Sequence, residues 1–260
     1  MDTTSITEKR GSGQWLGFIW FGLTVVALAI GFDEAMTAPT EATMGNLYRV
    51  FFYHFPHTIL SFVFPYLNCL ACFAYLYWRN RSPARALAAD AFALASAEIT
   101  VLYASIGLAT GVLWGRAAWG IWWTWDARLT TYLLLWLLYV SYLLVRGFSG
   151  SGAALPGGGQ PGIASAVLGV FAAIDIPICF MSIRWWRTQH PSPVFGGGKD
   201  SGIDPVMYQA VLWNLAAWAM WGIFVLGWRY ALERRRQRHA AAEALAFLSA
   251  DPLPSVTEVA

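Results

Sequence analysis

The chain has 260 residues, of which 57% are apolar and only 12% are charged. Soluble globular domains carry about 25% charged residues, so this balance excludes an ordinary soluble protein and indicates one that lies in a lipid bilayer. The formal net charge of +2 is too small to indicate binding to nucleic acid.

Six apolar runs approach or exceed the roughly 17 to 25 residues needed to cross the hydrocarbon core of a membrane. We predict membrane helices at residues 15–32, 55–78, 91–113, 129–145, 163–183 and 206–228. The first run is longer than the apolar core of a secretory signal, and no clear A-x-A cleavage site follows it, so we expect it to remain as a helix. The sequence therefore predicts an all-α integral membrane protein with six transmembrane helices.

Lysine and arginine fall mainly on one side of this arrangement. If the N-terminus lies inside, eleven of the seventeen lie on its side of the membrane. Because cytoplasmic loops are enriched in these residues, both termini are predicted to be cytoplasmic. The outer loops are then about 33–54, 114–128 and 184–205. Residues 1–230 are expected to form one membrane domain, and residues 231–260 a basic cytoplasmic tail whose ERRRQRH segment suits anionic headgroups.

The second outer loop is unusually rich in tryptophan. It holds five of the fifteen tryptophans of the chain: Trp114, Trp119, Trp122, Trp123 and Trp125. An aromatic belt at the membrane surface explains isolated tryptophans but not five in one loop. Flat, rigid indole rings offer faces on which a large planar apolar ligand such as a porphyrin can lie. This loop is therefore the first candidate for a ligand site.

The local structure of this loop decides which way its side chains face. If it is helical, one stripe contains Trp119, Trp122, Trp123 and Asp126. Asp126 is expected to cap a helix beginning at Ala127, to contact the ligand directly, or to do both. Arg128 and Arg49 are candidate partners for acidic groups of the ligand, because an arginine fork matches a carboxylate.

Two histidines, His54 and His190, are candidate metal ligands from separate outer loops. His54 lies two residues before Pro56, and proline in a first turn is a helix start signal, so His54 is expected at the mouth of the second helix. Two imidazoles can bind the two faces of one haem iron. His57 is a rival to His54, because three residues later it points from nearly the same helix face. Two further aromatic candidates precede His190: Trp185 and Trp186.

Cys69 and Cys72 form a C-x-x-C pair in the second predicted span. Burial without cationic neighbours makes thiols unreactive, so we interpret them as small core residues. A membrane thiol–disulfide relay using this pair is the alternative function. Six spans also permit a small-solute permease, although nothing in the sequence resembles the inverted repeats of such proteins.

Two acidic residues fall inside predicted spans, where a charge costs roughly 2.5 to 3.5 kcal/mol on insertion scales. Asp175 precedes Pro177 near the outer edge, and we expect it to touch a cavity connected to the outer site. Glu98 is expected to pair with a polar neighbour such as Asn214.

Three ordered segments resemble the CcmC-type membrane haem-handling proteins of cytochrome c maturation, a family with a tryptophan-rich signature. They are GNLYRVFFYHFPH, WGIWWTWDARLT and IPICFMSIRWWRTQHPS, and the resemblance covers roughly residues 44–230. It implies that His54 and His190 are the axial ligands of haem b. It also implies that the loop at residues 114–128 is the haem platform and the docking surface for a partner. The additional imidazole of His57 and the charge of Asp175 depart from the family pattern.

The resemblance further implies a haem chaperone and transfer scaffold rather than a classical enzyme. Its expected place is the bacterial inner membrane, with the functional loops facing the periplasm. There it would present haem for covalent loading onto a periplasmic haem chaperone of the CcmE type. Its other expected partners are ABC transporter subunits of the CcmA and CcmB type and a small membrane subunit of the CcmD type.

Overall fold

The computed structural model describes residues 4–148, 162–191 and 203–250. Within these ranges the regular structure is helical, apart from an isolated bridge between Glu41 and Gly45. The helices are α1 (Thr4–Thr37), η1 (Asn46–Val50), α2 (Phe51–Trp78), α3 (Pro83–Trp119), α4 (Ala127–Phe148), α5 (Ile163–Ala172), α6 (Asp175–Trp185) and α7 (Pro205–Ala250).

Six segments of the described residues are long and apolar enough to cross a membrane: Trp15–Thr37, Asn46–Trp78, Pro83–Trp119, Ala127–Phe148, Ile163–Trp185 and Pro205–Phe247. Each overlaps one of the six predicted spans. The predicted fold class is therefore confirmed, and the chain is a multi-pass membrane protein. Most of the helices extend beyond the apolar runs, because capping residues rather than hydropathy determine where a helix ends.

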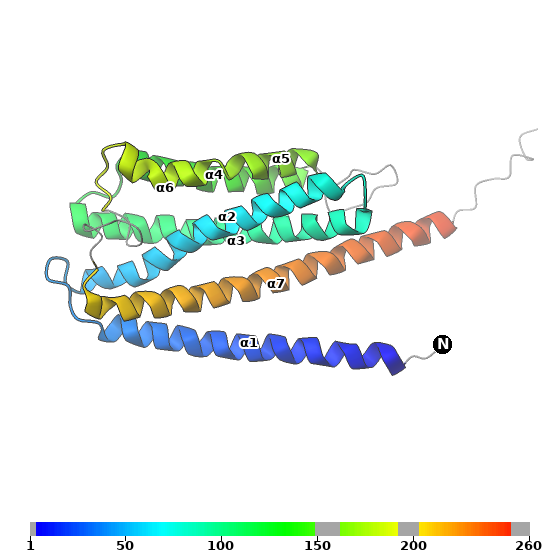
Figure 1. Ribbon diagram of the computed structural model, residues 1–260, viewed down its shortest axis with the longest axis horizontal. Coiled ribbons are helices and arrows are strands. Elements are labelled where there is room, and N and C mark those ends of the chain that lie inside the picture. The colour runs from blue at the N-terminus through cyan, green and yellow to red at the C-terminus, as the bar shows by residue number, and fades with distance from the viewer. Residues whose placement is uncertain (1–3, 149–161, 192–202, 251–260) are drawn as a thin grey trace, which may run out of the picture.

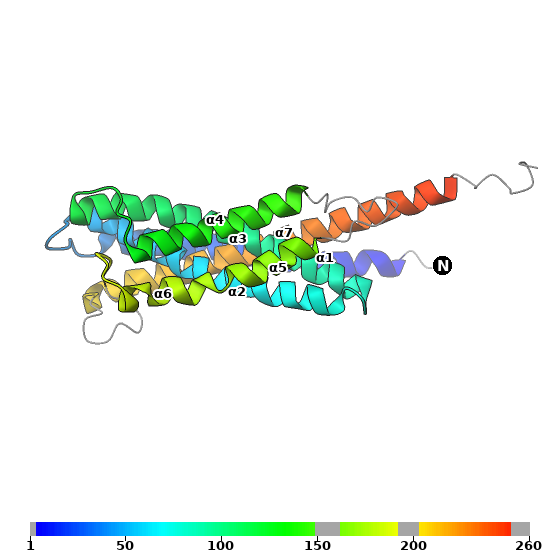
Figure 2. The same ribbon diagram turned by 90° about the horizontal axis from the view of Figure 1, so that it is seen from above.

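The helices form three layers (Figure 1). α2 and α3 pack extensively against each other in the middle layer. α4, α5 and α6 cover one side, while α7 and then α1 lie on the other side. The view from above shows α4 running along the α5–α6 pair (Figure 2). Fully buried aromatic residues fill the core, among them Tyr103, Tyr139, Tyr142 and Phe52.

The fifth span consists of two short helices, α5 and α6. Pro177 has no N–H to donate to the carbonyl of Ala173, and its ring clashes with that carbonyl in a regular helix. The backbone tightens here instead, with the N–H of Ile176 3.3 Å from the carbonyl oxygen of Ala173. Asp175 therefore lies at the joint between the two helices.

Two ion pairs connect α3 to its neighbours. Arg146 on α4 makes two hydrogen bonds of 2.5 Å to the buried carboxylate of Asp90. Arg229 on α7 makes two of 2.6 Å to Glu98. The predicted pairing of Glu98 with Asn214 is wrong, because a guanidinium neutralises the carboxylate as well as donating to it. The Asn214 amide instead donates to the carbonyl of Gly31 on α1, at 2.7 Å.

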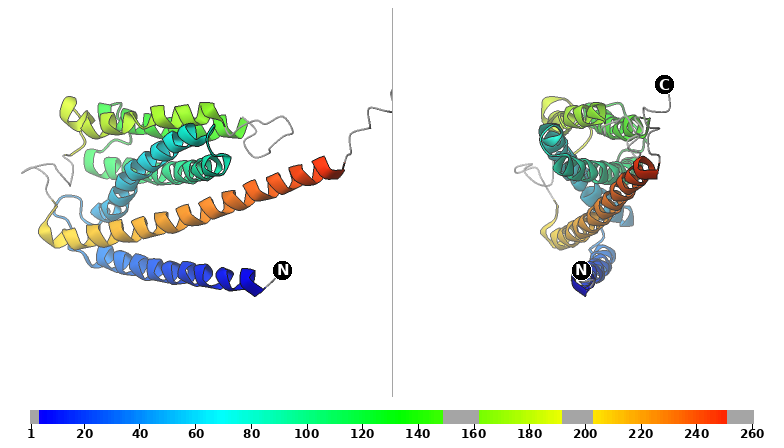
Figure 3. Two further views of the ribbon diagram at one scale, coloured as in Figure 1. Left: turned by 45° about the vertical axis from the view of Figure 1, so that its right-hand side comes forward. Right: turned by 90° about the vertical axis from the view of Figure 1, so that its right-hand side faces the viewer.

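α7 continues without a break through the segment predicted as a basic tail and ends at Ala250. Alanine, glutamate, arginine and glutamine are strong helix formers, which explains the continuation. Its last turns project beyond the rest of the bundle (Figure 3).

Candidate functional site

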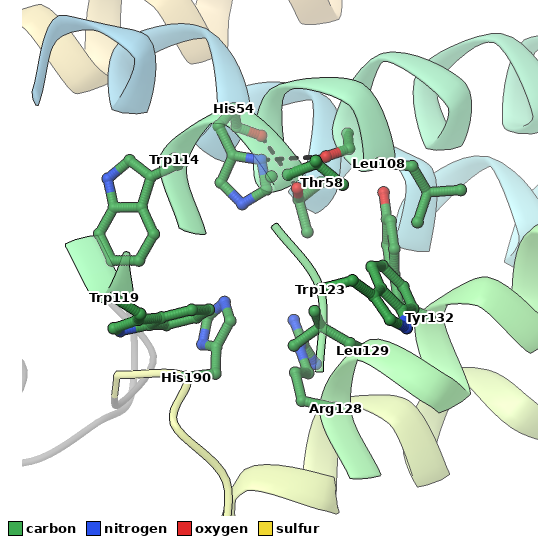
Figure 4. Close-up of a pocket in the computed structure, with 13 residues that line it drawn as sticks. His54, Thr58, Leu108, Trp114, Trp119, Trp123, Arg128, Leu129, Tyr132 and His190 are labelled. Carbon is green, nitrogen blue, oxygen red and sulfur yellow. Dashed lines mark hydrogen bonds between the residues drawn. The ribbon is translucent and has the colours of Figure 1, made fainter. Parts of the chain in front are cut away.

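A cavity of about 490 Å³ lies at the end of the bundle where α3 meets α4 (Figure 4). Part of this space is open to solvent. The residues that line it come from α2, α3, α4 and the segments following α3 and α6: His54, Thr58, Gly107, Leu108, Gly111, Val112, Trp114, Trp119, Trp123, Arg128, Leu129, Tyr132 and His190. Most of this lining is apolar, as expected of a site for a largely apolar ligand.

His54 lies in the first turn of α2 and faces the cavity (Figure 4). Its Nδ1 is 3.1 Å from the carbonyl oxygen of Gly107 and 3.1 Å from Oγ1 of Thr110. Because a carbonyl only accepts, Nδ1 carries the proton and Nε2 keeps its lone pair. The helix begins at Phe51, so Pro56 lies inside it rather than at its start as predicted. The turn of η1 leads directly into α2 and moves the start upstream.

His190 lies in the irregular segment after α6 and enters the cavity from the side opposite His54 (Figure 4). Its Nδ1 is 2.9 Å from the carbonyl oxygen of Pro191, so this ring also carries its proton on Nδ1 and leaves Nε2 free. Burial of the ring and the nearby charge of Arg128 lower the pKa of His190 to about 4. The imidazole is therefore neutral at pH 7, which is the form that binds metals.

Three glycines at intervals of four residues make room for the cavity wall on α3. A Cβ at Gly107 would lie 2.3 Å from the hydroxyl oxygen of Tyr132, and one at Gly111 would lie 2.9 Å from Cε1 of His54. At Gly115 it would lie 3.3 Å from the ring of Trp119. The sequence analysis missed these residues, although small residues spaced by four in a membrane span indicate close packing.

The tryptophan-rich loop is not helical beyond α3. Gly120 adopts φ 77°, and its N–H bonds to the carbonyl of Arg116, which ends the helix at Trp119. The predicted helical stripe from Trp119 to Asp126 is therefore wrong. Trp114 and Trp119 reach the cavity from α3, and Trp123 reaches it from the loop.

The buried indole nitrogens of Trp114 and Trp123 have no hydrogen-bond partner among the residues that the structure describes. An indole N–H usually has a partner when it is buried, so these two are available to a polar group of a ligand.

Arg49 and four of the candidate tryptophans do not line the cavity. Arg49 donates hydrogen bonds to the carbonyl of Ala35 and to Oδ1 of Asn46. Four tryptophans on the segments that border the cavity are each more than half exposed: Trp122, Trp125, Trp185 and Trp186. They form an aromatic outer surface rather than a cavity wall.

Asp126 and Arg128 have separate positions at the start of α4. Oδ1 of Asp126 accepts a hydrogen bond of 3.0 Å from the backbone N–H of Leu129, so the predicted capping role is confirmed. Asp126 does not line the cavity, whereas the buried Arg128 does. The Arg128 guanidinium donates to the carbonyl of Cys179 at 2.6 Å and lies over the ring of Phe62.

His57 and Asp175 face away from this site. His57 is buried, its Nδ1 is 2.6 Å from the carbonyl oxygen of Tyr53, and its ring packs against that of Trp218. Asp175 is also buried, and one of its carboxylate oxygens has no partner. Neither residue lines the cavity. Asp175 therefore does not touch this cavity itself, and its contact with a second cavity connected to the site stays a prediction.

The metal chemistry of the cavity is limited to two imidazoles. Among the described residues, no group of three or more histidine, cysteine or acidic side chains could hold a bare metal ion. Zinc sites in proteins have at least three protein ligands, so two histidines do not make one. Two imidazoles on opposite sides of a cavity suit a metal that already has its other ligands, as haem iron does.

The fold and the cavity define the class: a multi-pass membrane protein with six spans and a two-histidine, tryptophan-walled cavity at one end. The model of the family described as Heme exporter protein C matches residues 6–244, and the chain belongs to this family.

Curated relatives from distant organisms are similar over most of their length. Heme exporter protein C of Bradyrhizobium diazoefficiens is 34% identical, over 74% of this chain and 70% of the relative. The protein of the same description from Escherichia coli is 32% identical, over 75% of each. A ccmC-like mitochondrial protein of cytochrome c biosynthesis from Marchantia polymorpha is 32% identical, over 73% of this chain and 74% of the relative.

Proposed function

We propose that the chain binds haem b, iron protoporphyrin IX, in the cavity, with His54 and His190 as the axial ligands of the iron. One observation carries this proposal. The Nδ1 atom of each ring is hydrogen-bonded to a backbone carbonyl, which leaves Nε2 of both rings available to a metal from opposite sides of the cavity. The description of the relatives as heme exporters supports it.

The other residues that line the cavity suit both the apolar macrocycle and the acidic edge of a porphyrin. The rings of Trp114, Trp119 and Trp123 provide apolar surface for the macrocycle. The unpartnered N–H groups of Trp114 and Trp123 can donate to its polar edge, and the guanidinium of Arg128 supplies positive charge for a propionate. Haem bound there supplies an iron centre and reactive vinyl groups, while the protein binds and orients it.

The function that we infer is the presentation of haem for covalent loading onto a periplasmic haem chaperone of the CcmE type during cytochrome c maturation. The exposed tryptophans that border the cavity are the proposed docking surface: Trp122, Trp125, Trp185 and Trp186. The chain would work with ABC transporter subunits of the CcmA and CcmB type and a small CcmD-type subunit. The relation to a protein of cytochrome c biosynthesis supports this assignment.

The cavity is proposed to face the periplasm from the bacterial inner membrane. Eleven of the seventeen lysines and arginines belong to segments at the end of the bundle opposite the cavity. Since positive residues collect on the cytoplasmic side, this distribution supports a periplasmic cavity.

The visible spectrum of the purified protein tests the axial ligands. We expect a low-spin Soret spectrum with haem, which is weakened or changed in His54→Ala and His190→Ala and absent in the double variant. His57→Ala is the matched control, because its ring lies on the same helix but outside the cavity. Loss of the low-spin spectrum in His57→Ala alone would contradict the ligand assignment.

The thiol–disulfide alternative is tested by Cys69→Ala/Cys72→Ala. Cys72 is fully buried within a span, where it has no access to a partner's thiol. Haem loading in cells should therefore persist in the double variant. A complete loss of loading, with a normal haem spectrum, would favour the relay.

A further inference from the structure

A second opening, which we name the interfacial groove, lies between η1 and the last turns of α3. Its volume is about 1,110 Å³, part of which is open to solvent. Its walls include Leu47 and Val50 on η1, Leu113 and Ala117 on α3, and Trp122 on the loop, with Arg116 beside them. The groove is therefore apolar along its length and carries one positive charge.

The groove lies where two candidate membrane spans end. Its walls are the ends of two spans, Asn46–Trp78 and Pro83–Trp119. Leu47 and Leu113 are each more than half exposed, although both are large and apolar. Exposed leucines at the end of a membrane span lie where acyl chains meet headgroups, so the occupant of the groove is expected to come from the bilayer.

Arg116 is the unneutralised charge at this opening. Its guanidinium lies 5.7 Å from the centre of the Trp122 ring, and it makes no ion pair or hydrogen bond with the described residues. An arginine fork matches phosphate oxygens, and a charge at the membrane interface attracts anionic lipid.

We propose that the interfacial groove binds an anionic phospholipid, with its phosphate on Arg116 and an acyl chain along Leu47, Val50 and Leu113. Charge complementarity and the apolar walls support this occupant. A second tetrapyrrole is a poorer match, because the residues lining the groove include no histidine, cysteine, methionine or tyrosine that could bind its metal.

The groove and the cavity share a wall. Trp122 lines the groove, and the next residue, Trp123, lines the cavity. On the last turn of α3, Arg116 likewise faces the groove, while Trp119 faces the cavity. A phospholipid in the groove therefore packs against the back of the tryptophan wall and limits its movement.

Native mass spectrometry of the haem-free, full-length protein tests the proposal. Dioleoylphosphatidylglycerol is added to the detergent-solubilised protein, and dioleoylphosphatidylcholine is added in parallel. We expect a preference for phosphatidylglycerol that falls about tenfold in Arg116→Gln, the loss typical of one charge-assisted contact. Ala117→Trp, which fills the groove, should lower binding of both lipids.

Arg81→Gln is the matched control. The Arg81 guanidinium also lies over an aromatic ring, that of Tyr77, but at the opposite end of the bundle. Phosphatidylglycerol binding should be unchanged in this variant. Circular dichroism of each variant verifies that it is folded.

Three results would overturn the proposal. The first is equal binding of the two lipids, and the second is binding unaffected by Arg116→Gln. The third is haem that stays bound in His54→Ala/His190→Ala and is lost when Arg116→Gln is added. That result would assign the groove to a tetrapyrrole. Lipid binding is measured without haem, so its failure leaves the proposed haem site intact, and failure of the haem spectrum leaves the lipid site intact.

Discussion

Gly111→Ala should weaken haem binding without removing any ligand. The new Cβ would lie 2.9 Å from Cε1 of His54, whereas ordinary contacts begin at 3.4 Å. The ring must therefore move by about 0.5 Å, which is the limit of displacement that a binding site tolerates. The ring is also held by hydrogen bonds to Gly107 and Thr110, so a shift either lengthens these bonds or tilts Nε2.

A misplacement of about 1 Å can cost a site about 100-fold, so we expect a shift of half that size to lower haem affinity by about 10-fold. Stability should change much less. Alanine is better than glycine in a helix by about 1 kcal/mol, which offsets part of the roughly 1 to 3 kcal/mol cost of overpacking. The apo protein should thus lose no more than about 2 kcal/mol of its free energy of unfolding.

Haem titration followed at the Soret band measures the affinity, and thermal unfolding of the apo protein measures the stability. Gly22→Ala is the control, because its Cβ would meet no atom within 4 Å. This variant should bind haem as the parent does. Wild-type affinity in Gly111→Ala would refute the argument that the glycine sets the position of His54.

Three further predictions concern pH and stability. Because the pKa of His190 is lowered to about 4, protons should not compete with iron for this ring near its ordinary pKa of 6.5. The stability from its neutral form is complete above pH 6.5 and is lost as the pH falls toward 4. An acid titration of the low-spin spectrum checks this, and a midpoint near 6.5 would contradict it. Asp126→Ala should lower the free energy of unfolding by about 0.5 to 2 kcal/mol, because it removes the cap of α4. Asp126→Asn should lower it by less, because asparagine also caps helices. Thermal unfolding measures both losses, and equal losses would show that the cap is unimportant. Arg146→Met should cost about 3 to 5 kcal/mol because it removes the ion-pair partner of the buried Asp90 carboxylate, which the 3.5 Å hydrogen bond from the neutral amide of Gln237 does not replace. Asp90→Leu/Arg146→Met should recover most of this loss in denaturant titrations. A double variant as unstable as the single one would argue against the desolvation cost.

The sequence predicted the six spans because a bilayer demands long apolar runs, and such runs are local features. It could not predict the partner of Glu98, since Arg229 is 131 positions away and only the packing of α7 on α3 brings them together. Pro177 in the sequence indicated a break in the fifth span. Where that break places Asp175 depends on how the helices pack, which the sequence does not show.

The candidate site was predictable in composition rather than in arrangement. The sequence placed five tryptophans in one outer loop, whereas Trp114 and Trp119 lie on the last turns of α3 and only Trp122, Trp123 and Trp125 lie beyond it. Gly120 then ends α3, so that neighbours such as Trp122 and Trp123 face opposite sides of the loop. No periodicity describes such an irregular segment. The separation of His54 from His57 likewise depends on how α2 is rotated against α3 and α7.

The unbroken length of α7 has a mechanical consequence. Its 46 residues, at about 1.5 Å each, form a rod of about 69 Å, more than twice the roughly 30 Å thickness of the hydrocarbon layer. About half of this rod must stand in headgroups and water. The basic cluster at residues 234–238 still lies beside α3, where the Gln237 amide donates to the carbonyl of Leu87 at 3.1 Å, and the turns after it project beyond the bundle (Figure 1). A protein that binds the projecting turns could therefore shift or tilt α7, whose first turns pack against the start of α2, the helix that carries His54.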